Sequence, residues 1–187
     1  MYRALTWHAL QQGVEPHDEH ALARLAASAH VDVREGAPSA TESTRVLIDG
    51  AEATPHLRDP DVEANVSLVS RVAGVRAALV RIQRSLAEHG RVVMAGRDIG
   101  TVVLPHADLK VYLDASREVR AHRRAEQLRA ARIEPDYQGL MRELARRDGI
   151  DSTRAASPLT AAQEAVIINT DTMTIEQVVD RILQEAM

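Results

Sequence analysis

Arginines supply the side chains of this sequence that are best suited to chemistry, and they gather in one stretch of the chain. Arg120, Arg123 and Arg124 are spaced so that a helix would carry all three on one face. A guanidinium group is always charged and binds phosphate oxygens through pairs of hydrogen bonds. The pattern therefore indicates a clamp on a polyphosphate that is losing a phosphoryl group. The alternative is a solvated helix face on which Glu126 and Glu143 pair with the arginines.

A second candidate site follows a short apolar run at residues 91–95. Gly96 would allow a ligand to approach the backbone closely. Arg97 and Asp98 would offer a partner for phosphate next to a hydrogen-bond acceptor. The same three residues could instead form a simple turn that is closed by a salt bridge.

Several other chemistries have no support in the sequence. Cysteine is absent, which excludes disulfides, cysteine zinc ligands and cysteine nucleophiles. The eight histidines are scattered and show no metal-binding spacing, and no Gly-x-Ser-x-Gly motif is present. We therefore expect no metal site built from protein residues alone. Lys110 is the only lysine, so any reaction that needs a lysine depends on it.

The composition is that of an ordinary soluble protein. The 187 residues carry a net charge of -4 and only 2% aromatic residues, which argues against a nucleic-acid partner. No apolar run approaches the roughly 20 residues of a membrane-spanning helix, and we expect no secretory signal from the first residues, which hold no long apolar stretch. We expect a cytoplasmic protein without a membrane segment.

Strands and helices must alternate to position the candidate residues. Three short apolar runs, at residues 91–95, 109–113 and 165–169, end in polar residues, as is typical of strands buried on both faces of a parallel sheet. Arginine-rich helices are expected at 117–132 and 137–147, and an amphipathic helix after Thr174. This order predicts an α/β sheet that binds ligands at the carboxyl ends of its strands.

The first half of the chain predicts helices around a hairpin. Asp18 is expected to start the second of two N-terminal helices. Short strands are expected at 31–33 and 45–48, with Asp49-Gly50 as a hairpin turn. A helical stretch from about 60 to 88 is expected to break at Gly74.

These motifs together resemble the bacterial cytidylate kinases, a family of nucleoside monophosphate kinases. The resemblance covers essentially the whole chain. It rests on YRALT at residues 2–6, Val75-Arg76, GRDIGTVVLP at 96–105, LKVYLDAS at 109–116, RAHRR at 120–124, and Arg147-Asp148 with Asp151, Arg154 and Pro158-Leu159. It implies a single domain over residues 1–187 with the three-layer α/β/α parallel sheet of P-loop kinases. A small insert at 30–62 would bind the nucleoside monophosphate, and an arginine-rich helical lid would cover 117–157.

The resemblance also implies a reaction and the residues that perform it. A monomer would transfer the γ-phosphoryl group of ATP to CMP or dCMP, with Mg²⁺. The cytosine ring would be contacted by Ser67, Arg76 and Asp98, the monophosphate by Arg3, Arg97 and Arg154, and the sugar by Arg147 and Asp151. Tyr2 would be a further substrate-binding residue. The ATP phosphates would be bound by Arg120, Arg123 and Arg124, with Arg120, Arg124 and Arg154 as the catalytic residues. A carboxylate such as Asp98 suits the amino group of cytosine, which is a donor.

One part of the family pattern is missing from these 187 residues. They contain no Gly-x-x-x-x-Gly-Lys-[Ser/Thr] motif, and Lys110 follows no glycine-rich loop. We expect that the first strands and the P-loop are absent from this chain, through a fragment or a start codon placed too late. The expected consequence is a poor kinase of marginal stability. Strand edges would remain unpaired, and the backbone amides and lysine that bind the ATP phosphates would be missing.

Three other functions stay open. The chain could be a relative without a P-loop that binds CMP but transfers nothing. It could be a kinase for another small substrate such as UMP. The arginine-rich face at 117–132 could instead bind nucleic acid.

Overall fold

The computed structural model describes residues 1–36, 44–88, 90–153 and 160–187. They form two units, Met1–Val92 and Val93–Met187, each with its own internal packing. The described residues are a mixture of helices, one antiparallel sheet and one parallel sheet. The predicted mixed α/β class with a parallel sheet is therefore confirmed.

The N-terminal unit begins with two helices, α1 (Tyr2–Gln11) and α2 (Glu19–Ser28). The side chain of Asp18 accepts a hydrogen bond from the backbone N–H of Ala21 at 2.9 Å, so the predicted cap of α2 is confirmed. Leu5 and Leu22 are fully buried from the two helices. They join a core that also contains Ile48 and Leu79.

A three-stranded antiparallel sheet follows, with the order β1 (Val31–Glu35), β2 (Thr44–Ile48), β3 (Ala51–Glu52). Asp49 and Gly50 both have positive φ, 48° and 79°, and join β2 to β3. This backbone is the one that a two-residue hairpin loop requires, and Asp-Gly tolerates it well. The predicted strands and the predicted turn are confirmed. A 3₁₀ turn, η1 (Thr54–His56), leads on to the next helices.

The long helical stretch divides into α3 (Pro60–Arg71) and α4 (Ala73–Ala87). The break lies at Val72, whose ψ of 120° is extended, so the prediction of a break at Gly74 was wrong by two residues. Gly74 lies inside α4, where α2 and α4 pack together. A Cβ atom at this position would lie 2.5 Å from the Cβ of Ala23. Gly74 therefore allows α2 and α4 to pack closely. A glycine in a helical sequence pattern can indicate either such packing or a helix break, and the pattern alone does not distinguish them.

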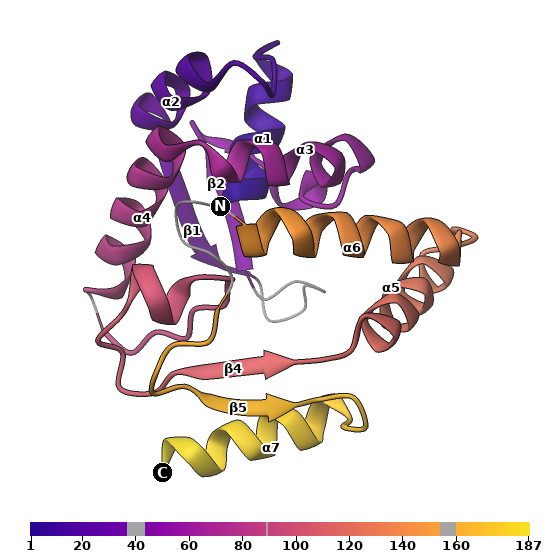
Figure 1. Ribbon diagram of the computed structural model, residues 1–187. Helices are drawn as coiled ribbons and strands as arrows, with labels where there is room; N and C mark the ends of the chain where they lie inside the picture. The colour runs from indigo at the N-terminus through magenta and orange to yellow at the C-terminus, as the bar shows by residue number, and fades with distance from the viewer. Residues whose placement is uncertain (37–43, 89, 154–159) are drawn as a thin grey trace. The chain divides into compact units, whose positions relative to one another are not determined.

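In the C-terminal unit, β4 (Val111–Asp114) pairs in parallel with β5 (Val166–Asn169), and Val111 lies opposite Val166. Helices α5 (Arg117–Ala130) and α6 (Tyr137–Thr153) lie between the two strands in sequence and pack on each other. Figure 1 shows β4 and β5 side by side, with α5 starting just beyond the arrowhead of β4. The parallel pair and its helical connection were predicted correctly.

The last helix, α7 (Ile175–Ala186), starts as predicted. Thr174 and Gln177 form a reciprocal capping box, in which each side chain bonds the other residue's backbone N–H.

The prediction of a strand at residues 91–95 was wrong. These residues have no regular secondary structure, and the side chain of Val93 is fully exposed. A strand needs a neighbour for its backbone N–H and C=O groups. Among the described residues, β4 and β5 pair only with each other, so the run at 91–95 has no partner there.

The burial predicted for the parallel strands was also wrong in part. Ile168 of β5 is buried, at 5% exposed, whereas Leu113 and Ile167 are each more than half exposed. A strand is buried on both faces only when layers cover both sides of its sheet.

Candidate functional site

The guanidinium group of Arg76 is the most deeply placed charge among the predicted site residues of the N-terminal unit. Arg76 lies in the first turn of α4 and is 5% exposed. Its Nη1 donates to the carbonyl oxygen of Ser70 at 3.3 Å. Ser70 belongs to the last turn of α3, where carbonyl groups lack helical partners and carry partial negative charge. The turn at Val72 therefore brings Arg76 back onto the carboxyl end of α3.

Ser67 and Tyr2 lie near this arginine. Ser67 is buried, at 3% exposed, and its carbonyl oxygen accepts a hydrogen bond from the hydroxyl of Ser70 at 3.2 Å. The guanidinium carbon of Arg76 lies 5.7 Å from the centre of the Tyr2 ring, within the range of a cation–π contact. The unit thus joins three of the residues expected at a nucleotide: Tyr2, Ser67 and Arg76.

Arg3 connects α1 to the start of α3. Its Nη1 donates to the carbonyl oxygen of Leu57 at 2.7 Å and to Glu63 at 3.1 Å. The two acceptors hold one terminal nitrogen of the guanidinium group.

Asp98 and Arg97 begin an unusual turn in the C-terminal unit. Asp98 is 6% exposed, and its carbonyl oxygen accepts from the backbone N–H of Val103 at 3.2 Å. This bond spans five residues and forms part of a π-helical turn, η2 (Ile99–Val103). Single π turns occur frequently at functional sites. The side chain of Arg97 is partly exposed beside it.

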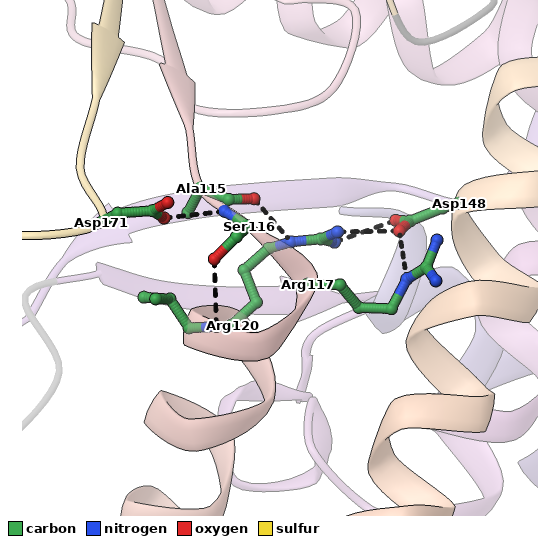
Figure 2. Close-up of polar contacts among 7 residues, drawn as sticks. Ala115, Ser116, Arg117, Arg120, Asp148 and Asp171 are labelled. Carbon is green, nitrogen blue, oxygen red and sulfur yellow. Dashed lines mark hydrogen bonds and ion pairs between the residues drawn. The ribbon is translucent and has the colours of Figure 1, made fainter.

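The arginine-rich helix α5 carries an ion-pair cluster at its start. Arg120 makes two parallel hydrogen bonds to the carboxylate of Asp148 on α6, at 2.9 and 2.7 Å. Its Nε donates to the carbonyl oxygen of Ala115 at 3.2 Å. Arg117, one turn earlier, lies 3.5 Å from the same carboxylate. Figure 2 shows both guanidinium groups converging on Asp148.

The first turn of α5 fixes the position of this cluster. The hydroxyl of Ser116 accepts from the backbone N–H of Val119 at 3.3 Å and so caps the helix. The backbone N–H of Ser116 donates to Asp171, which follows β5, at 2.7 Å. Both strand ends thus anchor α5, and Arg120 lies beside the carboxyl end of β4.

Mutual hydrogen bonding shifts the pKa of both partners in the cluster. The bonds from Arg120 hold the pKa of the Asp148 carboxyl below its ordinary value, with a further contribution from Arg117. Its bonds to Asp148 raise the pKa of the Arg120 guanidinium. Both groups are therefore charged throughout the physiological pH range.

The next two arginines of α5 have different surroundings. Arg123 donates through Nη1 to the hydroxyl of Thr170 at 3.0 Å and through Nη2 to the carbonyl oxygen of Thr170. These bonds attach α5 to the end of β5. Arg124 is partly exposed, with Nη1 3.5 Å from Gln127.

The remaining predicted residues lie on or after α6. The Nε atom of Arg147 is buried without a hydrogen-bond partner among the described residues. The side chain of Asp151 and the whole of Arg154 fall outside the described residues.

Comparison with known proteins gives the family directly. A sequence model of the family described as cytidylate kinase matches residues 1–187. A cytidylate kinase of Pelotomaculum thermopropionicum is 46% identical over 98% of this chain and 80% of its own length. One from Anoxybacillus flavithermus is 45% identical over the same shares. The chain belongs to the cytidylate kinase family. A bifunctional pantoate ligase/cytidylate kinase of Gloeobacter violaceus is 44% identical over 98% of this chain and 36% of its own length.

Membership of the cytidylate kinase family makes the chain one of a group of nucleotide-binding phosphotransferases. The resemblance inferred from the sequence motifs is confirmed. The roles predicted for individual residues stay predictions.

Two contacts of the arginine-rich helix α5 were missed by the sequence prediction. Asp148 was recognised as part of a motif but was given no role, and Thr170 was not singled out. Each meets its arginine across a long stretch of chain, 28 and 47 residues, so no local spacing indicates the pair. Within α5, Glu126 lies 3.3 Å from the imidazole of His122, a contact that the alternative of glutamate–arginine pairs did not include.

Neither a metal cluster nor a membrane helix is found among the described residues. No three His, Asp or Glu side chains there gather closely enough to hold a metal ion. Within the same ranges, no helix combines the length and the apolar character needed to cross a bilayer.

Proposed function

We propose that this chain catalyses the transfer of the γ-phosphoryl group of ATP to CMP or dCMP, with Mg²⁺ accompanying the nucleotide. The observation that carries the proposal is the match of the whole chain to the cytidylate kinase family at up to 46% identity among the relatives compared. Among the described residues, no group of three His, Asp or Glu side chains lies close enough to hold a metal ion.

The proposed base contacts are Arg76, Ser67 and Asp98. Cytosine presents an amino donor beside a ring nitrogen and a carbonyl oxygen, which are acceptors. The carboxylate of Asp98 would accept from the amino group, and the guanidinium of Arg76 would donate to the acceptors. Both residues are buried, at 6% and 5% exposed, which suits groups that bind a base away from water.

The proposed phosphate contacts are arginines. Arg3 and Arg97, with Arg154, would bind the monophosphate, while Arg147 and Asp151 would bind the sugar. Helices α5 and α6 would belong to the lid, and Arg120, Arg123 and Arg124 would face the ATP phosphates. Phosphoryl transfer needs positioned positive charge and exclusion of water more than covalent chemistry.

We also propose that the 187 residues by themselves turn over slowly. They contain no Gly-x-x-x-x-Gly-Lys-[Ser/Thr] motif, which in P-loop kinases supplies backbone amides and a lysine to the phosphates. The same observation favours a second candidate function, a protein that binds CMP without transferring a phosphoryl group.

The decisive experiment measures CMP binding by calorimetry and ADP release in a coupled assay on the same preparation. Binding with turnover supports the kinase, and binding without turnover supports the second candidate. UMP binding that equals CMP binding would refute cytosine recognition.

Asp98→Ala tests the base contact. We expect CMP affinity to fall by about 1–3 kcal/mol, or roughly 5- to 150-fold, with ATP affinity unchanged. Asp108→Ala removes an exposed carboxylate from the same region and is the matched control. Circular dichroism must show that both variants fold. Equal CMP affinity in Asp98→Ala and the parent chain would refute the role of Asp98.

A further inference from the structure

The guanidinium group of Arg120 is already hydrogen-bonded to a carboxylate through two parallel bonds, the geometry that it would also use for a phosphate. A guanidinium group has five N–H donors, and its strongest contacts use two parallel donors at once. In the described structure, both terminal nitrogens of Arg120 donate to Asp148, and Nε donates to Ala115. The two N–H groups left over lie on different terminal nitrogens. Arg120 as held here therefore has no pair of parallel donors left for a phosphate (Figure 2).

The ion pair between Arg120 and Asp148 can separate without leaving either charged group unpaired. The Nε–Ala115 bond holds the guanidinium beside the end of β4 independently of Asp148. A displaced Asp148 carboxylate would keep Arg117, whose Nε already lies 3.5 Å from it. The side chains of Arg120 and Asp148 are 34% and 24% exposed, so a solute can reach the pair. A polyphosphate carries more charge than a carboxylate and offers several oxygens, so it can compete for the same donors.

We propose that Asp148 is a positioning residue that takes the place of the donor phosphate on Arg120 until a polyphosphate displaces it. It keeps Arg120 oriented in the free protein and lowers the affinity of this arginine for the donor. The inference deepens the proposed function, since it assigns a competitor to one arginine of the donor site. Removing the Asp148 carboxylate should therefore tighten polyphosphate binding. If that carboxylate only held Arg120 in its binding position, removing it would weaken binding instead.

The test uses the full chain and inorganic tripolyphosphate, with calorimetry at fixed pH and ionic strength. Asp148→Asn should bind tripolyphosphate about two- to fivefold more tightly than the parent, the range expected for loss of a partly exposed ion pair. Asp136→Asn is the matched control, because it removes one negative charge from an exposed pair with Arg142 in the same unit. We expect less than a twofold change there. Asp148→Ser provides a second neutral variant whose effect must have the same direction.

A double-mutant cycle separates displacement from general electrostatics. In an Arg120→Gln background, Asp148→Asn should give no gain, because the donors that it releases are gone. A gain that persists in that background would overturn the proposal, as would unchanged or weaker binding by Asp148→Asn. Failure of every chain to bind tripolyphosphate would also overturn it. Failure of CMP binding or ADP release would instead refute the proposed function, so the two outcomes are distinguishable.

Discussion

Gly74→Ala should destabilise the N-terminal unit, although alanine is the better helix former. The new Cβ would lie 2.5 Å from the Cβ of Ala23, whereas ordinary contacts begin at 3.4 Å. Helices α2 and α4 must therefore move apart by about 1 Å, and overpacking of this kind costs about 1–3 kcal/mol. The gain in helix propensity returns about 1 kcal/mol. The net expectation is a loss of up to about 2 kcal/mol in the free energy of unfolding.

The assay is urea unfolding followed by the fluorescence of Trp7, the only tryptophan of the sequence. Trp7 lies on α1, stacks on His56 with ring centres 5.1 Å apart, and packs against the core of the same unit. Its signal therefore reports on the unit that carries the substitution.

A compensating variant identifies the cause of the loss. Ala23→Gly with Gly74→Ala removes the clashing methyl group, so the two changes should show a coupling energy of about 1–2 kcal/mol in favour of the double variant. Gly149→Ala in α6 is a second control, because its new Cβ would meet nothing within 4 Å. Far-UV circular dichroism should show a small gain in stability there. Equal or greater stability of Gly74→Ala, or no rescue by Ala23→Gly, would refute the packing argument.

Two further predictions concern the attachment of α5 in the C-terminal unit. Thr170→Val should lower the free energy of unfolding by about 1–2 kcal/mol, because the buried hydroxyl accepts from Arg123 and donates to the carbonyl oxygen of Asp114. Thr170→Ser should recover most of this loss in urea unfolding followed by circular dichroism, and a valine variant as stable as the parent would contradict the role of the hydroxyl. The lowered pKa of Asp148 predicts a stabilisation that is present above the ordinary aspartate pKa of about 4 and disappears as the pH falls through the lowered value. Unfolding measured between pH 5 and 2 should therefore show a smaller acid-induced loss in Asp148→Asn than in the parent, and identical profiles would show that the ion pair adds no stability.

Local sequence patterns correctly predicted the helix starts and the hairpin turn, which depend on interactions between neighbouring residues. Asp18 and Thr174 were expected to start helices, and both accept the backbone hydrogen bonds of a cap. Asp49-Gly50 was expected to turn a hairpin, and both residues have the positive φ that the turn requires. These outcomes depend on a few neighbouring residues, so the sequence around them contains the necessary information.

Patterns failed where a distant segment decides the outcome. The apolar run at 91–95 is as suitable for a strand as β5, but only β5 has a pairing partner among the described residues. Gly74 is as compatible with a helix break as with close packing, and the position of Ala23 on α2 decides between them. Strand pairing and helix contact are properties of two segments, and neither segment alone specifies them.

The sequence by itself determined the family, the candidate arginines and most of the helices and strands. The cytidylate kinase family model matches residues 1–187, and recognising that match does not require a folded structure. Only the tertiary structure decided what those arginines contact: Arg120 binds Asp148 across 28 residues, and Arg123 binds Thr170 across 47. A long charged side chain can reach many partners, and which one it meets depends on helix packing and strand pairing that bring remote residues within hydrogen-bond distance.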